Sequence, residues 1–117
     1  LVATGTVLAT GGLAAPLIDA AWRDQPTLLD DCLEGVAEVS GVRDGVRFAV
    51  EIDVDGRGHI AGVTAKVPSP PGEPFARCVE AAVKAGLRLR APVLARATHA
   101  RTEFIIGFPS ADGAGYR

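Results

Sequence analysis

The sequence has 117 residues and a formal charge of −2, with 48 % hydrophobic and 22 % charged residues. These values are typical of one folded domain, and they argue against a disordered chain and against a nucleic-acid binder. One local basic stretch is interpreted as a solvated strand face: Arg88, Arg90, Arg96 and Arg101.

The first part of the chain predicts a short strand and an interrupted helix. Residues 2–9 alternate loosely, and two glycines follow them. Residues 13–39 carry apolar residues at helical spacing, and Pro26 predicts a kink or a restart of that helix. Thr27, followed by Asp30, is typical of the cap of the restarted helix.

The middle of the chain predicts a β-hairpin. Residues 46–54 alternate cleanly between an apolar and a mainly polar face, as a half-buried strand does. Asp55-Gly56 is a strong signal for a two-residue turn. Residues 60–67 are the returning strand, and a proline-rich loop follows.

The last part predicts a second helix and two more strands. The helix covers residues 74–85, and the strands cover residues 87–94 and 98–108. Helices on one face of an antiparallel sheet make an α+β two-layer sandwich, so we expect two helices packed on one face in the order β-α-β-β-α-β-β. Residues 1–109 are expected to form a single domain, and residues 110–117 a flexible tail.

Two cysteines, Cys32 and Cys78, lie in the two predicted helices. Their spacing fits no metal site, which leaves a disulfide, two buried thiols or a reactive thiol. We expect the disulfide, because both residues fall on apolar helix faces that can meet across the core. Closing so long a loop would stabilise the fold by about 4 kcal/mol. Such a bond would place the domain in an oxidising compartment.

No catalytic site, metal site or cofactor is expected. His59 and His99 have no partners at ligand spacing, and no phosphate-binding loop or serine nucleophile motif is present. The residues around Asp55 resemble the start of a calcium loop, but the glutamate that should end the loop is missing. A Cys–His nucleophile is the one enzyme alternative, and thiolates are disfavoured on apolar helix faces.

Three segments resemble a known family: GVRFAVEIDVDGRGHIAGVTAKV, CVEAAVKAGLRLRAP and TEFIIGF. They are similar to the C-terminal domain of TonB-family energy transducers, and closest to the myxobacterial AgmX/PglI C-terminal type. The paired cysteines, Cys32 and Cys78, frame the hairpin as they do in that type. Leu33 departs from the pattern, since the family usually has an aromatic residue after the first cysteine.

The resemblance implies a periplasmic or cell-envelope adaptor of a Gram-negative bacterium that serves energy transduction. Such a domain binds a peptide of a protein partner, for example an outer-membrane receptor, along a sheet edge. Unless it is central or blocked, the expected edge is the strand of residues 98–108, with Thr102, Phe104 and Ile106 as partner-binding residues. The alternative is a permanent structural subunit of a larger envelope or motility assembly, or a homodimer.

Membrane association is expected only through segments outside this chain. Residues 1–21 are too often interrupted by glycine, proline and aspartate to form a transmembrane helix, and they lack the charged start of a signal peptide. Because the sequence opens without methionine, we expect a processed protein or an excised domain, with a targeting or anchoring segment missing from view.

Overall fold

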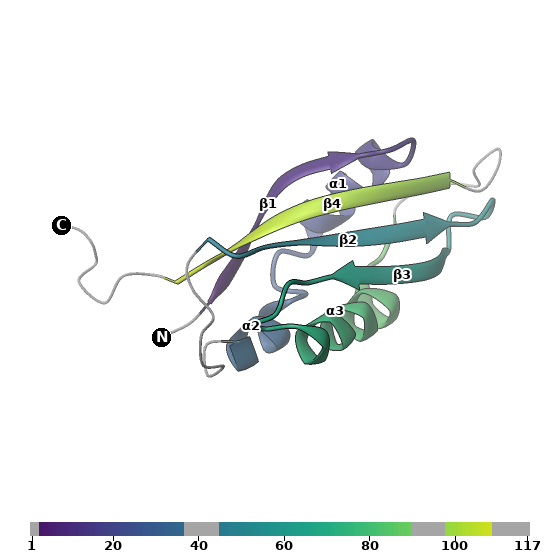
Figure 1. The fold of residues 1–117 in the computed structure, drawn as a ribbon. Helices are drawn as coiled ribbons and strands as arrows, with labels where there is room; N and C mark the ends of the chain where they lie inside the picture. The colour runs from purple at the N-terminus through teal and green to yellow at the C-terminus, as the bar shows by residue number, and fades with distance from the viewer. Residues whose placement is uncertain (1–2, 37–44, 90–97, 109–117) are drawn as a thin grey trace.

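The computed structural model describes residues 3–36, 45–89 and 98–108, which form an antiparallel sheet with three helices on one face (Figure 1). The elements are β1 (Thr4–Gly11), α1 (Ala15–Asp24), α2 (Asp30–Val36), β2 (Arg47–Val54), β3 (Ile60–Lys66), α3 (Glu73–Gly86) and β4 (Thr98–Gly107). The strand order is β1-β4-β2-β3, and every neighbouring pair is antiparallel. The predicted α+β class is confirmed, while the predicted tail lies outside the described residues.

The predicted first helix is two helices. α1 carries Pro16 in its first turn and ends before Pro26, whose ring and missing N–H do not fit a helix interior. A turn follows in which the Asp30 amide donates to the Thr27 carbonyl at 3.1 Å, and α2 begins there. The predicted break at Pro26 is therefore confirmed, and the structure contains three helices among the described residues instead of two.

The core lies between the helices and one face of the sheet. Alternate residues of β2 and β4 are buried on that face: Phe48, Val50, Ile52, Val54, Ala100, Thr102, Phe104 and Ile106. Aromatic rings form a continuous row through it, with Phe104 stacked on Phe48 at 4.9 Å and edge-on to Trp22 at 5.1 Å. Phe75 meets Phe48 edge-on at 5.1 Å, so the row joins α1 to α3 across the two central strands.

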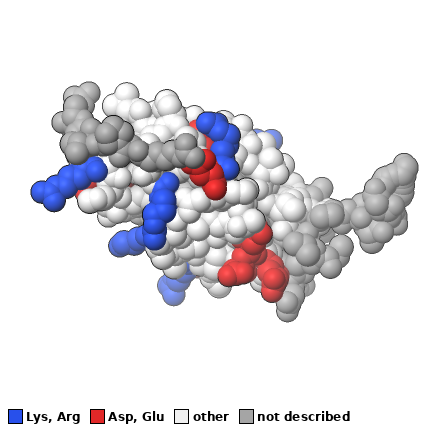
Figure 2. Space-filling model, turned by 180° about the vertical axis from the view of Figure 1, so that it is seen from behind, with Lys and Arg blue, Asp and Glu red and all other residues white. Residues whose placement is uncertain are grey.

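The opposite face of the sheet is charged and carries ion pairs between strands. Arg101 lies 3.6 Å from Glu51 and 2.8 Å from Glu103, and Lys66 lies 3.8 Å from Glu51. Arg101 is therefore part of a solvated strand face, as the sequence pattern predicts. Two other arginines of the basic stretch, Arg90 and Arg96, lie outside the described residues. Figure 2 shows the side of the molecule that the helices cover. Most of this surface is uncharged, and the charged side chains on it lie in separate small groups.

The hairpin between β2 and β3 turns through residues 55–59 and not through a two-residue turn. The Asp55 amide donates to the His59 carbonyl at 2.9 Å, and Gly58 adopts the positive φ of 82°. The Asp55 carboxylate accepts hydrogen bonds from the amides of His59 at 2.9 Å and Arg57 at 2.8 Å. These bonds, chiefly that from His59, lower the pKa of the Asp55 carboxyl.

The strand predicted for residues 87–94 is wrong over its described part, and the rest of that range lies outside the described residues. Leu87 is buried, and its amide closes the end of α3 on the Val83 carbonyl at 3.0 Å. The Gln25 side chain holds the next residues, since it donates to the Gly86 carbonyl and accepts from the Arg88 amide at 2.7 Å. The alternating leucines thus pack in the helical layer instead of extending the sheet.

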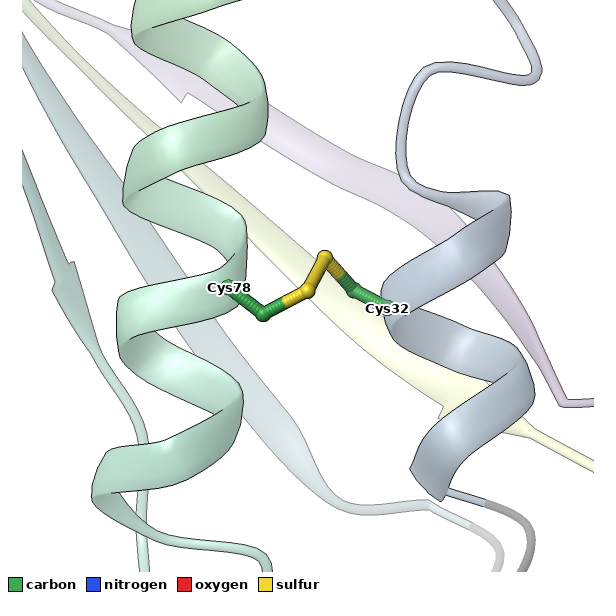
Figure 3. Close-up of a disulfide and its surroundings, with 2 residues drawn as sticks. All are labelled: Cys32 and Cys78. Carbon is green, nitrogen blue, oxygen red and sulfur yellow. A yellow bond between two sulfur atoms is a disulfide. The ribbon is translucent and has the colours of Figure 1, made fainter.

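A disulfide joins Cys32 of α2 to Cys78 of α3, as predicted (Figure 3). Their Cα atoms lie 5.8 Å apart, and the bond connects the two neighbouring helices within one layer. Cys32 is buried, as its predicted place on an apolar face requires. Cys78 is exposed, so its predicted place on the apolar face of its helix is wrong: it lies beside the buried stripe of α3 and not within it. The bond therefore fastens α2 to α3 from the solvent side of the helical layer.

Replacing both cysteines, Cys32→Ser with Cys78→Ser, should destabilise the domain by about 4 kcal/mol, because a loop with a sequence separation of 46 residues is no longer closed. Denaturant unfolding under oxidising conditions measures this difference. With a reductant present, the wild type should unfold like the double variant. A loss below about 1 kcal/mol would contradict the proposed contribution of the bond.

Asp55→Asn should remove part of the acid sensitivity of the domain. Because the pKa of Asp55 is lowered in the folded state, its stabilising contribution is present above the unfolded-state pKa and is lost as pH falls through the folded pKa. Asparagine keeps an acceptor oxygen but does not titrate there. The difference in melting temperature between wild type and variant should therefore shrink between about pH 5 and pH 2. A constant difference would argue against this role.

Candidate functional site: the free edge of the sheet

The strand expected to be the binding edge lies in the centre of the sheet. β4 pairs with β1 on one side and with β2 on the other, so its main-chain groups have no free side. Thr102, Phe104 and Ile106 are 0 %, 3 % and 0 % exposed, respectively. The prediction that the last strand is an edge with these partner-binding residues is therefore wrong, because pairing between the ends of the chain places β4 inside.

One true edge, β3, has an outer amide that is occupied by a side chain of α3. The Ala65 amide points away from β2 and donates to the Glu80 carboxylate of α3 at 2.9 Å. Glu80 is half-buried, and α3 packs beside the strand. A carboxylate bonded to an edge amide competes with any added strand, which is one way in which proteins protect sheet edges.

The other edge, β1, has free outer main-chain groups. The Ile106 amide donates to the Val46 carbonyl at 2.8 Å, so the even-numbered residues of β4 point their main-chain groups away from β1. The alternation of an antiparallel ladder then leaves the groups of Gly5, Val7 and Thr10 on the outer side of β1. Within the described part of the chain, no hydrogen bond outside the ladder reaches these groups.

A β-bulge shapes this edge at Leu8. The register shifts between Val7 and Ala9, which leaves Leu8 as an extra residue on β1. Leu8 is 43 % exposed and is one of two large hydrophobic residues with high exposure in the described chain, the other being Leu13 at 78 %. An exposed apolar residue at an unpaired edge favours contact with another chain.

Two grooves lie along β1 on the helical side. The first has a volume of about 270 Å³ and lies between the first half of β1 and the corner between α1 and α2. The second, of about 400 Å³, lies between the second half of β1 and α1. Both are lined by Val7 and Trp22, so the two grooves meet at these residues. Side chains of a strand added to β1 would enter them in turn, since every second side chain points to the same face.

A chain of hydrogen bonds fixes α1 to the inner side of this edge. Trp22 Nε1 donates to the Thr102 hydroxyl at 2.9 Å, and this hydroxyl lies 3.3 Å from that of Thr10. Thr10 donates to the Asp19 carboxylate at 3.2 Å, which also pairs with Arg23 at 2.9 Å. Because Thr10 donates to Asp19, its oxygen accepts the Thr102 proton, and every group in the chain is satisfied. These bonds anchor β1 to α1 and β4 at Thr10.

Sequence patterns do not point to Trp22, Gly5 or Glu80 as functional residues. Each of them matters through the order of the strands, which depends on pairing between distant segments. Leu8, at the bulge of β1, does have a local signal, because it directly follows Val7 and so breaks the alternation of residues 2–9.

Comparison of the chain with protein-family models, with curated proteins and with solved structures gives no match. The likeness to TonB-family domains thus stays a prediction from the sequence motifs. In the described residues, no group of three or more His, Cys, Asp or Glu side chains is placed to hold a metal ion. Among the same residues, no helix is both long and apolar enough to cross a membrane.

Thr102→Val should destabilise the domain by about 1–3 kcal/mol, because it leaves the buried Trp22 N–H without its acceptor. Thr64→Val is the matched control, since Thr64 is exposed on the open face of β3. Urea unfolding followed by tryptophan fluorescence measures both variants. Equal stability of the two variants would show that the buried hydroxyl does not hold α1 on the sheet.

Proposed function

We propose that this chain is a non-catalytic interaction domain of the cell envelope that binds an extended segment of a partner protein along the outer edge of β1. The observation that carries the proposal is the contrast between the two sheet edges. Glu80 occupies an outer amide of β3, whereas the outer groups of β1 have no such partner in the described chain. Main-chain pairing on such an edge supplies affinity, and pockets for alternate side chains supply specificity.

The anchoring of β1 supports this mode of binding. An edge that is already ordered loses little conformational entropy when a strand is added, so more of the pairing free energy appears as affinity. The hydrogen bonds from Trp22 through Thr102 to Thr10 tie β1, α1 and β4 together. The partner segment therefore bears most of the ordering cost, as is usual for extended peptides.

The disulfide supports a location outside the cytoplasm. Thiol-reducing systems keep cytosolic cysteines reduced, and the exposure of Cys78 would leave this bond open to them. Together with the resemblance to TonB-family domains, this favours the periplasm of a Gram-negative bacterium. An adaptor that transmits force or energy to an outer-membrane partner is the role that the resemblance implies.

Val7→Pro should abolish or strongly weaken partner binding, because proline removes an outward N–H of β1 without removing a ladder bond. The probe is a display library of random linear peptides, selected against the wild-type domain. Selected peptides should protect the Gly5 and Val7 amides from hydrogen exchange, and Val7→Pro should lower their affinity about tenfold or more.

Val63→Pro is the matched control, because Val63 has the same outward orientation on β3 as Ala65. It should leave peptide affinity unchanged. Should Val7→Pro fail to fold, Leu8→Lys places a charge at the bulge of β1, and Leu13→Lys places one on an exposed leucine beyond the strand. Peptides that bind Leu8→Lys and Leu13→Lys equally well, or that protect β3 instead, would overturn the proposal.

A further inference from the structure

We propose that the segment bound at β1 is basic and carries one apolar anchor side chain, an inference that rests on the proposed function. Main-chain pairing is nearly independent of sequence, so the chemistry of the partner must be found in the surfaces beside the edge. Two such surfaces flank β1 on its helical side. One is the apolar groove at its first half, and the other is the charged exterior of α1 and α2.

The groove at the first half of β1 has apolar side chains at its base, and Gly5, which has no side chain, leaves it open on the strand side. Its lining includes Trp22, Leu29 and Leu33. A Cβ atom added to Gly5 would lie 3.3 Å from Leu33 Cδ1, so the glycine leaves the strand open above these side chains. The residue of an added strand that lies opposite Gly5 points to the same face and therefore into the groove. An aliphatic or aromatic side chain gains most there, because it removes apolar surface from water.

The two helices beside β1, α1 and α2, carry a larger negative formal charge than the whole chain does. α1 and α2 hold five acidic residues and one basic residue: Asp19, Asp24, Asp30, Asp31, Glu34 and Arg23. Their formal charge is −4, whereas that of the whole chain is −2. Figure 2 shows acidic side chains gathered over α2. α3, beside the other edge, carries equal numbers of acidic and basic residues.

These charges argue against a second copy of the chain as the occupant. A symmetric dimer through β1 would continue the sheet and bring the α1 and α2 of both copies to the same interface. Acidic side chains of both copies, among them Asp19 and Asp30 of the grooves beside β1, would then approach each other, and like charges across an interface disfavour association. A segment with lysine or arginine on both sides of an apolar residue meets opposite charge instead.

Three synthetic peptides with blocked ends test the inference. Each alternates threonine and valine around a central leucine, and they differ only in their end residues, which are lysine, glutamine or glutamate. Trp22 is the single tryptophan and lines both grooves, so its fluorescence reports binding. At low salt the lysine peptide should bind about tenfold more tightly than the glutamate peptide, a difference of about 1.4 kcal/mol. Added salt should narrow this difference.

The chain supplies a matched pair of variants. Asp30 lines the groove beside β1, whereas Asp31, in the same first turn of α2, lines the groove beside the disulfide. Both substitutions by asparagine remove one charge from the same helix start. Asp30→Asn should lower the preference for the lysine peptide about threefold, in the range of one exposed ion pair. Asp31→Asn should lower it less.

The possible outcomes separate the two proposals. Equal affinity of all three peptides, with protection of the Gly5 and Val7 amides from exchange, would overturn the charge inference and leave edge pairing intact. No protection of these amides by any peptide would overturn edge pairing itself. A dimer with protected β1 amides in the absence of peptide would identify a second copy as the occupant and overturn the inference.

Discussion

The placement of β4 in the middle of the sheet is the constraint on which the rest of the domain depends. Thr102 of β4 is fully buried, and a buried hydroxyl is costly unless its hydrogen bonds are satisfied. Trp22 of α1 and Thr10 of β1 satisfy it from two different elements. A shift of β4 by one residue would turn Thr102 to the open face and break both bonds, so this side chain fixes the register of the strand and the position of the helix.

The helical layer is fastened at three places, two of them by hydrogen bonds and one by a covalent bond. α1 is held by the hydrogen bonds that start at Trp22, and α2 is held to α3 by the disulfide. The corner between α1 and α2 is held by Gln25, whose amide bonds to main-chain groups at the end of α3. The aromatic row adds apolar packing that runs from α1 to α3 across the core. A short helix such as α2 forms few bonds of its own, which explains why a covalent link is placed there.

Local patterns in the sequence predict the helices and strands of this fold better than they predict which of these elements lie side by side. The strand at residues 46–54 and the break at Pro26 follow from spacing and backbone chemistry, and the structure confirms them. The structure also confirms the expected disulfide, for which the cysteine spacing alone had left two alternatives open. Residues 87–89 alternate in the same way as a strand, but Leu87 is a buried residue at the end of α3, and periodicity over so short a run cannot distinguish the two. The edge prediction failed for a related reason, since chain order does not determine strand order.

Strand order decides which main-chain groups a sheet offers to other proteins, so it governs the candidate site more directly than any single residue does. Because β4 inserts between β1 and the hairpin, the two strands left at the edges are the first and the third. Glu80 then distinguishes them, since its carboxylate bonds to the outer side of β3 while β1 keeps its outer groups and its bulge. A protein that needed only to avoid aggregation would gain by covering both edges. The occupied amide of β3 and the anchored but unpaired β1 are the arrangement expected of a sheet that pairs with a partner strand on one side.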